Sequence, residues 1–303
     1  QKVYKGNVAD MAATVQNFME QYGKFVFTSE TFQVGDITGQ QVLEACVHTN
    51  KSAAGMDKWE PAELGLLSPL LFNWIAVLLN CIGSGAPWPD GTNHARAAYL
   101  SKDDARAGDP LQYRVLLILP AIYRKWAVIR DRGLAEWVDH WGMDEIYAGT
   151  GMQGAEDAAY EVATNMELWT LRGIGFVGGT VDIAKCFDQI LRPLVYRLLA
   201  LAGMPCRIID TYRRFQEALV IHNAIAGGIG RGFSRRCGIP QGCPLSMMIM
   251  ALLMRPWVSM IKAMGAIPVI LADDILVMTE GPGMLQNNGR CINATHGLSL
   301  IHI

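Results

Sequence analysis

The sequence predicts an α+β fold in which helices flank a small antiparallel sheet. Long segments with helical apolar spacing alternate with short runs rich in β-branched residues. Two of these runs are separated by the adjacent carboxylates Asp273 and Asp274, which predicts a hairpin that turns at this pair. Strands are expected at 112–119, 174–182, 267–272 and 275–279.

The helical spacing and its Gly and Pro punctuation place the expected helices. Residues 1–50 predict two helices around a polar linker at 29–39. Further helices are expected at 60–82, 118–141, 154–172, 192–220 and 242–262. The methionines of the last segment favour core packing over a cofactor site, because Met fills irregular gaps between apolar side chains.

Composition sets outer limits on the class of protein. A chain of 303 residues that is 51% hydrophobic is large enough to bury a core as one domain or two closely packed lobes. Its net charge of -2 argues mildly against nucleic-acid binding by overall charge. Basic residues nevertheless gather within 96–132 and 207–236, as in a groove that follows phosphates. The alternative is that many of them lie on solvated helix faces.

The seven cysteines and one uncharged stretch bear on the cellular setting. An odd number of cysteines without any Cys-x-x-Cys spacing argues against a zinc site or a disulfide framework, so we expect a reducing compartment, nucleus or cytoplasm. Residues 64–88 carry no charge and could span a bilayer by length, but Pro69 and Asn80 favour a buried core helix and no membrane contact. Because the chain starts at Gln1, we expect a fragment of a longer protein.

The paired acids Asp273 and Asp274 point to chemistry. Burial would raise the pKa of both carboxyl groups and cost free energy, so the pair needs exposure or a counter-charge. If the two carboxylates are exposed to solvent, the pair belongs to an ordinary β-turn. If they bind a divalent cation, the pair indicates catalysis. Asp182 follows another strand, where enzymes often place catalytic groups, although a turn or helix N-cap is the alternative. Between them, the glycines and prolines of 238–246 indicate a close backbone approach or an ordinary helix start.

The segments around Asp182, at 238–246 and around Asp273-Asp274 follow one another along the chain as the A, B and C motifs of reverse transcriptases do, and they resemble those motifs. The resemblance is greatest to the non-LTR retrotransposon type and next to the group II intron type. Asp182 with Phe187-Asp188 resembles the first motif, 238–246 the second, and 271–274 the third. Upstream segments similar to the family are 55–59, 85–88, 102, 113–115 and 123–126. The chain departs from the family at Leu271, where an aromatic residue is usual, and at Val115, where Pro is usual.

The resemblance implies the fingers and palm of a right-hand polymerase, with the thumb missing. It divides the chain into an N-terminal helical extension at 1–50, fingers with part of the palm at 51–173, a palm with the catalytic motifs at 174–286, and an unpatterned truncated tail at 287–303. The implied partners are an RNA template, a DNA primer and deoxynucleoside triphosphates.

The resemblance also implies two-metal nucleotidyl transfer with two Mg²⁺ ions, for which Mn²⁺ could substitute. Asp182 and Asp273 are expected to bridge the ions, with Asp274 and the Ile183 carbonyl in support. Residues expected to bind the incoming nucleotide are Lys102, Arg114, Phe187, Gln241 and Gly242. Residues expected to contact nucleic acid are Arg124, Lys125, Arg235 and Arg236.

Two other functions stay open. An RNA-dependent RNA polymerase would share the acids, but it needs a group that accepts a ribose 2′-hydroxyl where this chain has the bulky Phe187. A catalytically silent scaffold that only binds RNA would have no need of the three aspartates, and all of them are present.

Overall fold

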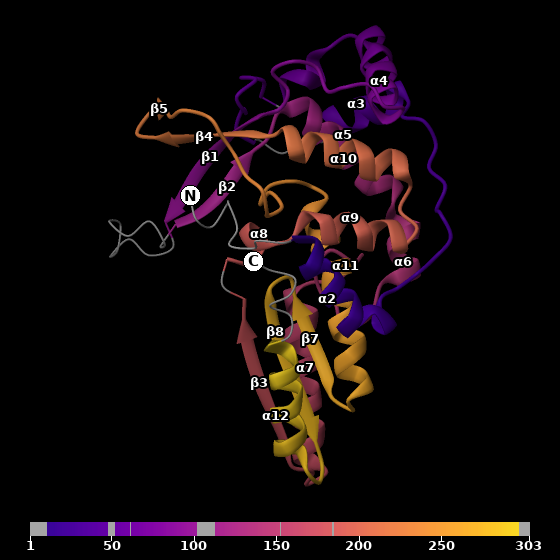
Figure 1. Ribbon diagram of the computed structural model, residues 1–303, viewed down its shortest axis with the longest axis vertical. Coiled ribbons are helices and arrows are strands. Elements are labelled where there is room, and N and C mark those ends of the chain that lie inside the picture. The colour runs from indigo at the N-terminus through magenta and orange to yellow at the C-terminus, as the bar shows by residue number, and fades with distance from the viewer. Residues whose placement is uncertain are drawn as a thin grey trace. The chain divides into compact units, whose positions relative to one another are not determined.

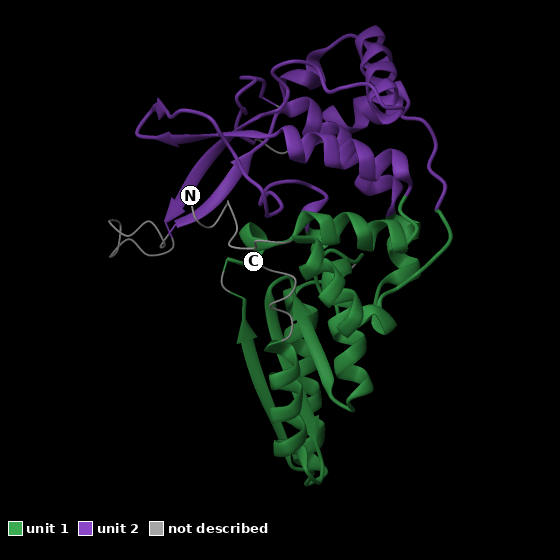
Figure 2. Ribbon diagram, in the orientation of Figure 1, with its two compact units in different colours: residues 1–31, 135–204, 247–303 green, residues 32–134, 205–246 purple. Residues whose placement is uncertain are grey.

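A computed structural model of the chain describes residues 11–47, 52–60, 62–101, 113–151, 153–183 and 185–296. Its two compact units are each assembled from segments that are distant in sequence (Figure 2). Unit 1 contains residues 1–31, 135–204 and 247–303, and unit 2 contains residues 32–134 and 205–246. Neither unit coincides with one of the continuous ranges expected from the sequence.

The sheet of unit 1 has three antiparallel strands in the order β3-β8-β7 (Figure 1). These strands are β3 (Phe176–Asp182), β7 (Ile267–Leu271) and β8 (Asp274–Glu280). The predictions for them were correct to within one or two residues. A short parallel bridge between Ile146 and Ile270 extends the sheet beyond β7.

Unit 1 also contains helices. They are α2 (Met11–Tyr22), η1 (Gly23–Phe25), α6 (Ala135–Trp141), α7 (Ala155–Leu171), α8 (Cys186–Gln189), α9 (Arg192–Leu201), α11 (Ser246–Ala263) and α12 (Met284–Thr295). Of these helices, α7 and α12 contact the sheet. The α7 helix packs on the sheet through a cluster that includes Ala158, Trp169, Val269 and Met278. The carboxylate-bearing strands are therefore backed by an apolar core.

Helix α12 corrects the sequence prediction for 287–303, which expected no pattern there. The helix contacts β3 and β8, and the Asn288 amide donates a hydrogen bond to the Val277 carbonyl at 3.0 Å. Its buried residues Asn288, Cys291 and Thr295 recur at helical spacing. Two of the three are polar, so an apolar pattern could not reveal the helix.

The sheet of unit 2 runs β2-β1-β4-β5, with β6 also paired to β4. Its strands are β1 (His94–Ser101), β2 (Tyr113–Ile118), β4 (Val220–Ile225), β5 (Gly228–Ile229) and β6 (Phe233–Ser234). The sequence predicted only β2. The alanines Ala95 and Ala97 on the buried face of β1 lack the β-branched signal that strand prediction depends on.

The helices of unit 2 are α3 (Gly39–Val47), η2 (Glu63–Leu66), α4 (Pro69–Gly83), α5 (Ala121–Gly133) and α10 (Cys206–Ala218). An aromatic core joins α5 to α10: Tyr123 and Phe215 stack with ring centroids 3.5 Å apart, and Trp88 donates a hydrogen bond to the Thr211 carbonyl at 3.2 Å. This core positions α5 against α10 within the unit.

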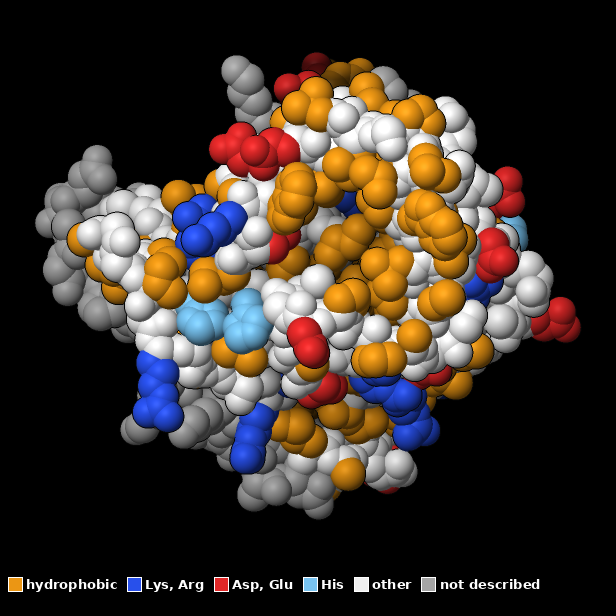
Figure 3. All heavy atoms as spheres, turned by 90° about the horizontal axis from the view of Figure 1, so that it is seen from above, with side chains coloured by type: hydrophobic (Ala, Val, Ile, Leu, Met, Phe, Trp, Pro, Cys, Tyr) orange, Lys and Arg blue, Asp and Glu red, His pale blue; other side chains and the backbone are white. Residues whose placement is uncertain are grey.

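Helix α4 coincides with the uncharged stretch of the sequence. One side of the helix is buried through Phe72, Ala76, Leu79 and Ile82. Figure 3 shows hydrophobic side chains gathered on the surface of the molecule seen from above. Exposed large hydrophobic residues on or near this helix are Leu66, Leu70, Leu71, Trp74, Val77 and Leu78. In the described part of the chain, α4 and every other helix fall short of the length and apolarity needed to cross a membrane.

Candidate active site

The hairpin of unit 1 turns at Ala272-Asp273, so Asp274 is the first residue of β8 and pairs with Leu271. The sequence prediction had placed the turn one residue later, at Asp273-Asp274. Ala272 has φ +59°, and a two-residue hairpin loop of the favoured kinds requires positive φ at this position. For a residue with a Cβ this costs about 1–2 kcal/mol. Such strain often accompanies functional sites.

Asp182 ends β3 directly opposite Asp274. Paired residues on antiparallel strands present their side chains on the same face, with Cβ atoms roughly 5 Å apart. Both aspartates are exposed to solvent. Two like charges at this separation repel, so the register favours a cation between or beside these carboxylates.

Asp273 lies close to the same point, as the buried thiol of Cys186 shows. Burial raises the pKa of Cys186, and the negative charges of Asp273, Asp182 and Asp188 raise the pKa further. The protonated thiol contacts the Met250 sulfur at 3.8 Å. The structure therefore brings together acids from the end of β3, the β7–β8 turn and α8.

The backbone after Asp182 turns sharply. The Cys186 amide donates to the Ile183 carbonyl at 3.2 Å, which leaves this oxygen a second lone pair. Lys185 then adopts φ +53°, so two of the positive-φ non-glycine residues, Lys185 and Ala272, adjoin the carboxylates. Asp188, which the sequence placed in the first motif with Asp182, is a buried carboxyl of this region, whereas no sequence signal identifies Lys185.

These acids fit a magnesium ion only if substrate oxygens complete its coordination. Within the described ranges, no three or more His, Cys, Asp or Glu side chains are grouped so that they could hold a metal ion. Mg²⁺ usually takes one or two carboxylates together with water and substrate phosphates. The all-oxygen set of Asp182, Asp273, Asp274 and the Ile183 carbonyl matches that preference.

Phe187 lies on α8, with only 8% of its surface exposed. The ring is thus part of the core of unit 1 as well as a neighbour of the acidic site in sequence. Its predicted contact with the sugar of a nucleotide stays a prediction.

Gln241 and Gly242 lie in unit 2, where they pack on β2. The Gln241 carbonyl accepts a hydrogen bond from the Leu117 amide at 2.9 Å. Gly242 has φ +110°, and a Cβ there would lie 2.7 Å from the Leu117 carbonyl oxygen. The close backbone approach that the sequence predicted for this glycine is therefore made with the protein's own strand. Its contact with a nucleotide stays a prediction.

The remaining nucleotide-binding candidates are basic. Arg114 is exposed on β2, opposite Leu100 of β1. Lys102 lies outside the described residues. Arg124 donates to the Ser52 hydroxyl at 3.0 Å and to the Ala53 carbonyl at 3.1 Å, and its contact with nucleic acid stays a prediction.

The predicted nucleic-acid contacts of Lys125 and Arg235 do not agree with the structure, because both side chains are buried in unit 2. The Lys125 ammonium donates to the Ala45 carbonyl at 2.8 Å, near the end of α3, and burial lowers its pKa. Arg235 donates to the Gln216 side-chain oxygen at 3.0 Å. Arg236, in contrast, is exposed.

A binding experiment separates the buried from the exposed cations. We expect Arg236→Gln to weaken binding of an RNA oligonucleotide and to lower the slope of log affinity against log salt by about one phosphate contact. Lys125→Met should leave that slope unchanged, because its charge does not reach the surface. Fluorescence anisotropy at several salt concentrations measures both. A reduced slope for Lys125→Met would contradict the burial argument.

Unit 1 thus defines a class of site: an antiparallel sheet with three aspartates at one end of its strands. Residues 162–297 match the family model described as reverse transcriptase (RNA-dependent DNA polymerase). The matched stretch is less than half of the chain, and it includes Asp182, Asp273 and Asp274. It supports reverse transcriptase activity in general. No curated protein matches the chain.

Proposed function

We propose that the chain is an RNA-directed DNA polymerase of a retrotransposon-like element, of the non-LTR type, which adds deoxynucleotides to a primer 3′-hydroxyl on an RNA template. The observation that carries the proposal is the register of Asp182 opposite Asp274, with Asp273 in the adjoining turn. This arrangement falls inside the stretch that matches the reverse transcriptase model. The resemblance supports fingers with part of the palm at 51–173 and a palm with the catalytic motifs at 174–286.

In this proposal Asp182 and Asp273 hold two Mg²⁺ ions, with Asp274 and the Ile183 carbonyl in support, and Mn²⁺ can substitute. When bound, the ions lower the pKa of the primer hydroxyl and stabilise the leaving pyrophosphate. The chain's own contribution is preorganisation. The β3–β8 pairing and the strained turn at Ala272 hold the carboxylates in place before substrate arrives, so little reorganisation is needed during the reaction.

The other predicted roles complete the proposal. Arg114, Gln241 and Gly242 of unit 2, together with Lys102, bind the incoming nucleotide, and Arg236 contacts the nucleic-acid backbone. The reaction takes place in the nucleus or cytoplasm, a setting that suits the chain's seven cysteines.

Primer extension tests the function. The chain is incubated with Mg²⁺ and a DNA primer annealed to an RNA template, and deoxynucleotides are compared with ribonucleotides. We expect extension with deoxynucleotides. Extension with ribonucleotides alone would replace the proposal by an RNA-dependent RNA polymerase, and RNA binding without extension by either would leave a silent scaffold.

Phe187 gives a sharper test of sugar selection. A bulky ring beside the acidic site would collide with a ribose 2′-hydroxyl and tolerate deoxyribose, so Phe187→Ala should raise the relative use of ribonucleotides by about tenfold or more. Single-nucleotide incorporation assays measure the ratio of kcat/KM values. Phe187→Leu is the matched control, since it keeps an apolar side chain in the core of unit 1. Unchanged discrimination in Phe187→Ala would remove this residue from the proposal.

A further inference from the structure

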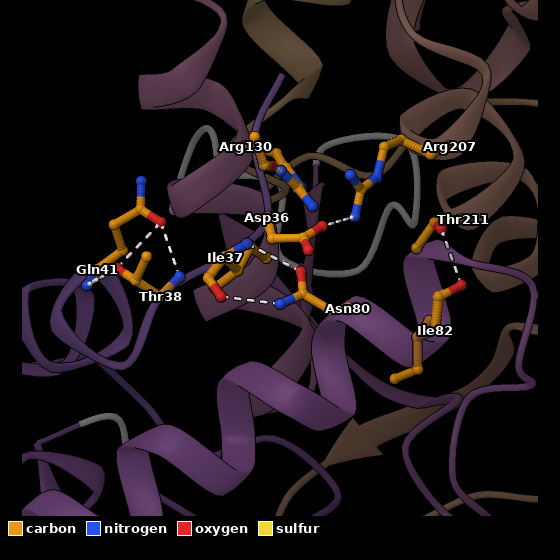
Figure 4. Close-up of polar contacts among 10 residues, drawn as sticks. Asp36, Ile37, Thr38, Gln41, Asn80, Ile82, Arg130, Arg207 and Thr211 are labelled. Carbon is orange, nitrogen blue, oxygen red and sulfur yellow. Dashed lines mark hydrogen bonds and ion pairs between the residues drawn. The ribbon is translucent and has the colours of Figure 1, made fainter. Parts of the chain in front are cut away.

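Two arginines of unit 2 point toward one carboxylate, that of Asp36 (Figure 4). Arg207 of α10 donates from Nη2 to Asp36 Oδ1 at 2.7 Å, and its side chain is 26% exposed against 74% for Asp36. Arg130 of α5 is only 5% exposed and donates from Nη1 to the Gly35 carbonyl at 2.9 Å. The cluster therefore combines one buried cation, one half-buried cation and one exposed anion.

Arg130 is incompletely paired. Its Nε and Nη2 atoms are buried and have no hydrogen-bond partner among the described residues. Burial and the positive charge of Arg207 together lower the pKa of Arg130 to about 10, although the Asp36 carboxylate opposes both effects. A single carboxylate facing two guanidinium groups leaves an excess of positive charge, which is costly where one of the cations is buried.

Guanidinium nitrogens of both arginines lie near the same point at Gly83. A Cβ added to Gly83 would lie 3.5 Å from Arg207 Nη2 and 3.9 Å from Arg130 Nη2. This is the C-terminal end of α4, whose partial negative charge of about half an electron offsets only part of the excess. Arg214 already bonds to the neighbouring Ile82 carbonyl and adds another positive charge nearby.

The backbone beside Asp36 is fixed, although its side chain is open to solvent. The Asn80 side chain brackets Ile37, since it accepts from the Ile37 amide and donates to the Ile37 carbonyl, both at 2.8 Å. A Cβ at Gly35 would meet no atom within 4 Å, so the space beside the residue that precedes Asp36 is open. Rotation of the Asp36 side chain alone would release Arg207 Nη2 and remove the carboxylate charge from beside Arg130.

We propose that Arg130 and Arg207 form a phosphate-binding site, which the Asp36 carboxylate occupies from within the chain. Guanidinium groups bind phosphate in a bidentate fork, and phosphate offers more negative charge and more acceptor oxygens than one carboxylate. It can therefore displace Asp36 and partner the nitrogens that Arg130 leaves unpaired. The phosphate can be a free anion or a phosphodiester of an RNA backbone, and this proposal is independent of the catalytic role of unit 1.

The test uses the whole chain and the exposed members of the cluster. Binding of inorganic phosphate is measured by calorimetry at constant ionic strength, and binding of a short RNA oligonucleotide by anisotropy. We expect Asp36→Asn to bind phosphate about tenfold more tightly, because it removes a competing charged hydrogen bond. Arg207→Gln should weaken binding about tenfold. If both substitutions also change the affinity for RNA in these directions, the natural ligand is a nucleic-acid phosphate. If they change only the affinity for inorganic phosphate, the natural ligand is a free phosphate.

Arg213 and Asp210 supply the matched control, because they form an exposed ion pair at 2.6 Å on the same helix. Asp210→Asn and Arg213→Gln should leave phosphate affinity unchanged. The proposal is overturned if Asp36→Asn binds phosphate no more tightly than the unaltered chain, if Arg207→Gln binds equally well, or if the control variants shift affinity by the same factor. Thermal unfolding of each variant shows that it is folded during the measurement.

Discussion

Asp182→Asn and Asp273→Asn should each reduce primer extension by at least about a hundredfold while leaving the protein folded. Asn keeps the size of the side chain but removes the charge that a divalent cation needs. Asp182 faces Asp274 across the β3–β8 pairing, and Asp273 occupies the adjoining turn, so either substitution removes a ligand from the same small region. Steady-state extension rates on an RNA template measure the loss.

Stability separates a catalytic role from a structural one. Because Asp182 and Asp274 are like charges on paired positions, Asp182→Asn should leave the free energy of unfolding unchanged or raise it by about 0.2–1 kcal/mol. Asp210→Asn, on the surface of α10, should keep full activity. An Asp182→Asn or Asp273→Asn enzyme that retains more than a few per cent of the rate would contradict the assignment.

The elements around the acids could be predicted because their signals are local. β-branched runs mark β3, β7 and β8, and an aspartate stands at or beside the end of each. The turn was predicted one residue too late because Asp is a common turn residue, whereas Ala at φ +59° is unusual. A local preference was overridden by the register that pairs Leu271 with Asp274.

What the sequence could not predict depends on distant contacts. The burial of Lys125 follows from the position of the Ala45 carbonyl, eighty residues away along the chain. Gly242 needs to be glycine because the carbonyl of Leu117 lies beside it, and no pattern within 238–246 contains that fact. A basic side chain can bind a ligand or pack within the protein, and so can a glycine. Only the neighbouring residues in the fold distinguish binding from packing.

Gly149→Ala should cause the largest loss of stability among the glycine substitutions of unit 1 that bear on the site. Gly149 has φ +80°, and a Cβ there would overlap the Met247 carbonyl in the first turn of α11 and lie 2.8 Å from the Met248 nitrogen. The segment just before it supports β7, since the Tyr147 amide donates to the Ile270 carbonyl at 2.9 Å. We expect a loss of about 4 kcal/mol or more in the free energy of unfolding, because neither backbone can yield alone.

Gly173→Ala distinguishes this collision from the cost of the backbone conformation. Gly173 has φ +66°, and a Cβ there would meet nothing within 4 Å, so only the left-handed conformation is penalised, at about 1–2 kcal/mol. Urea denaturation of both variants gives the difference. Equal losses would mean that α11 moves away from Gly149 without cost. A larger loss for Gly149→Ala, accompanied by slower primer extension, would show that the packing behind β7 holds Asp273 in its working position.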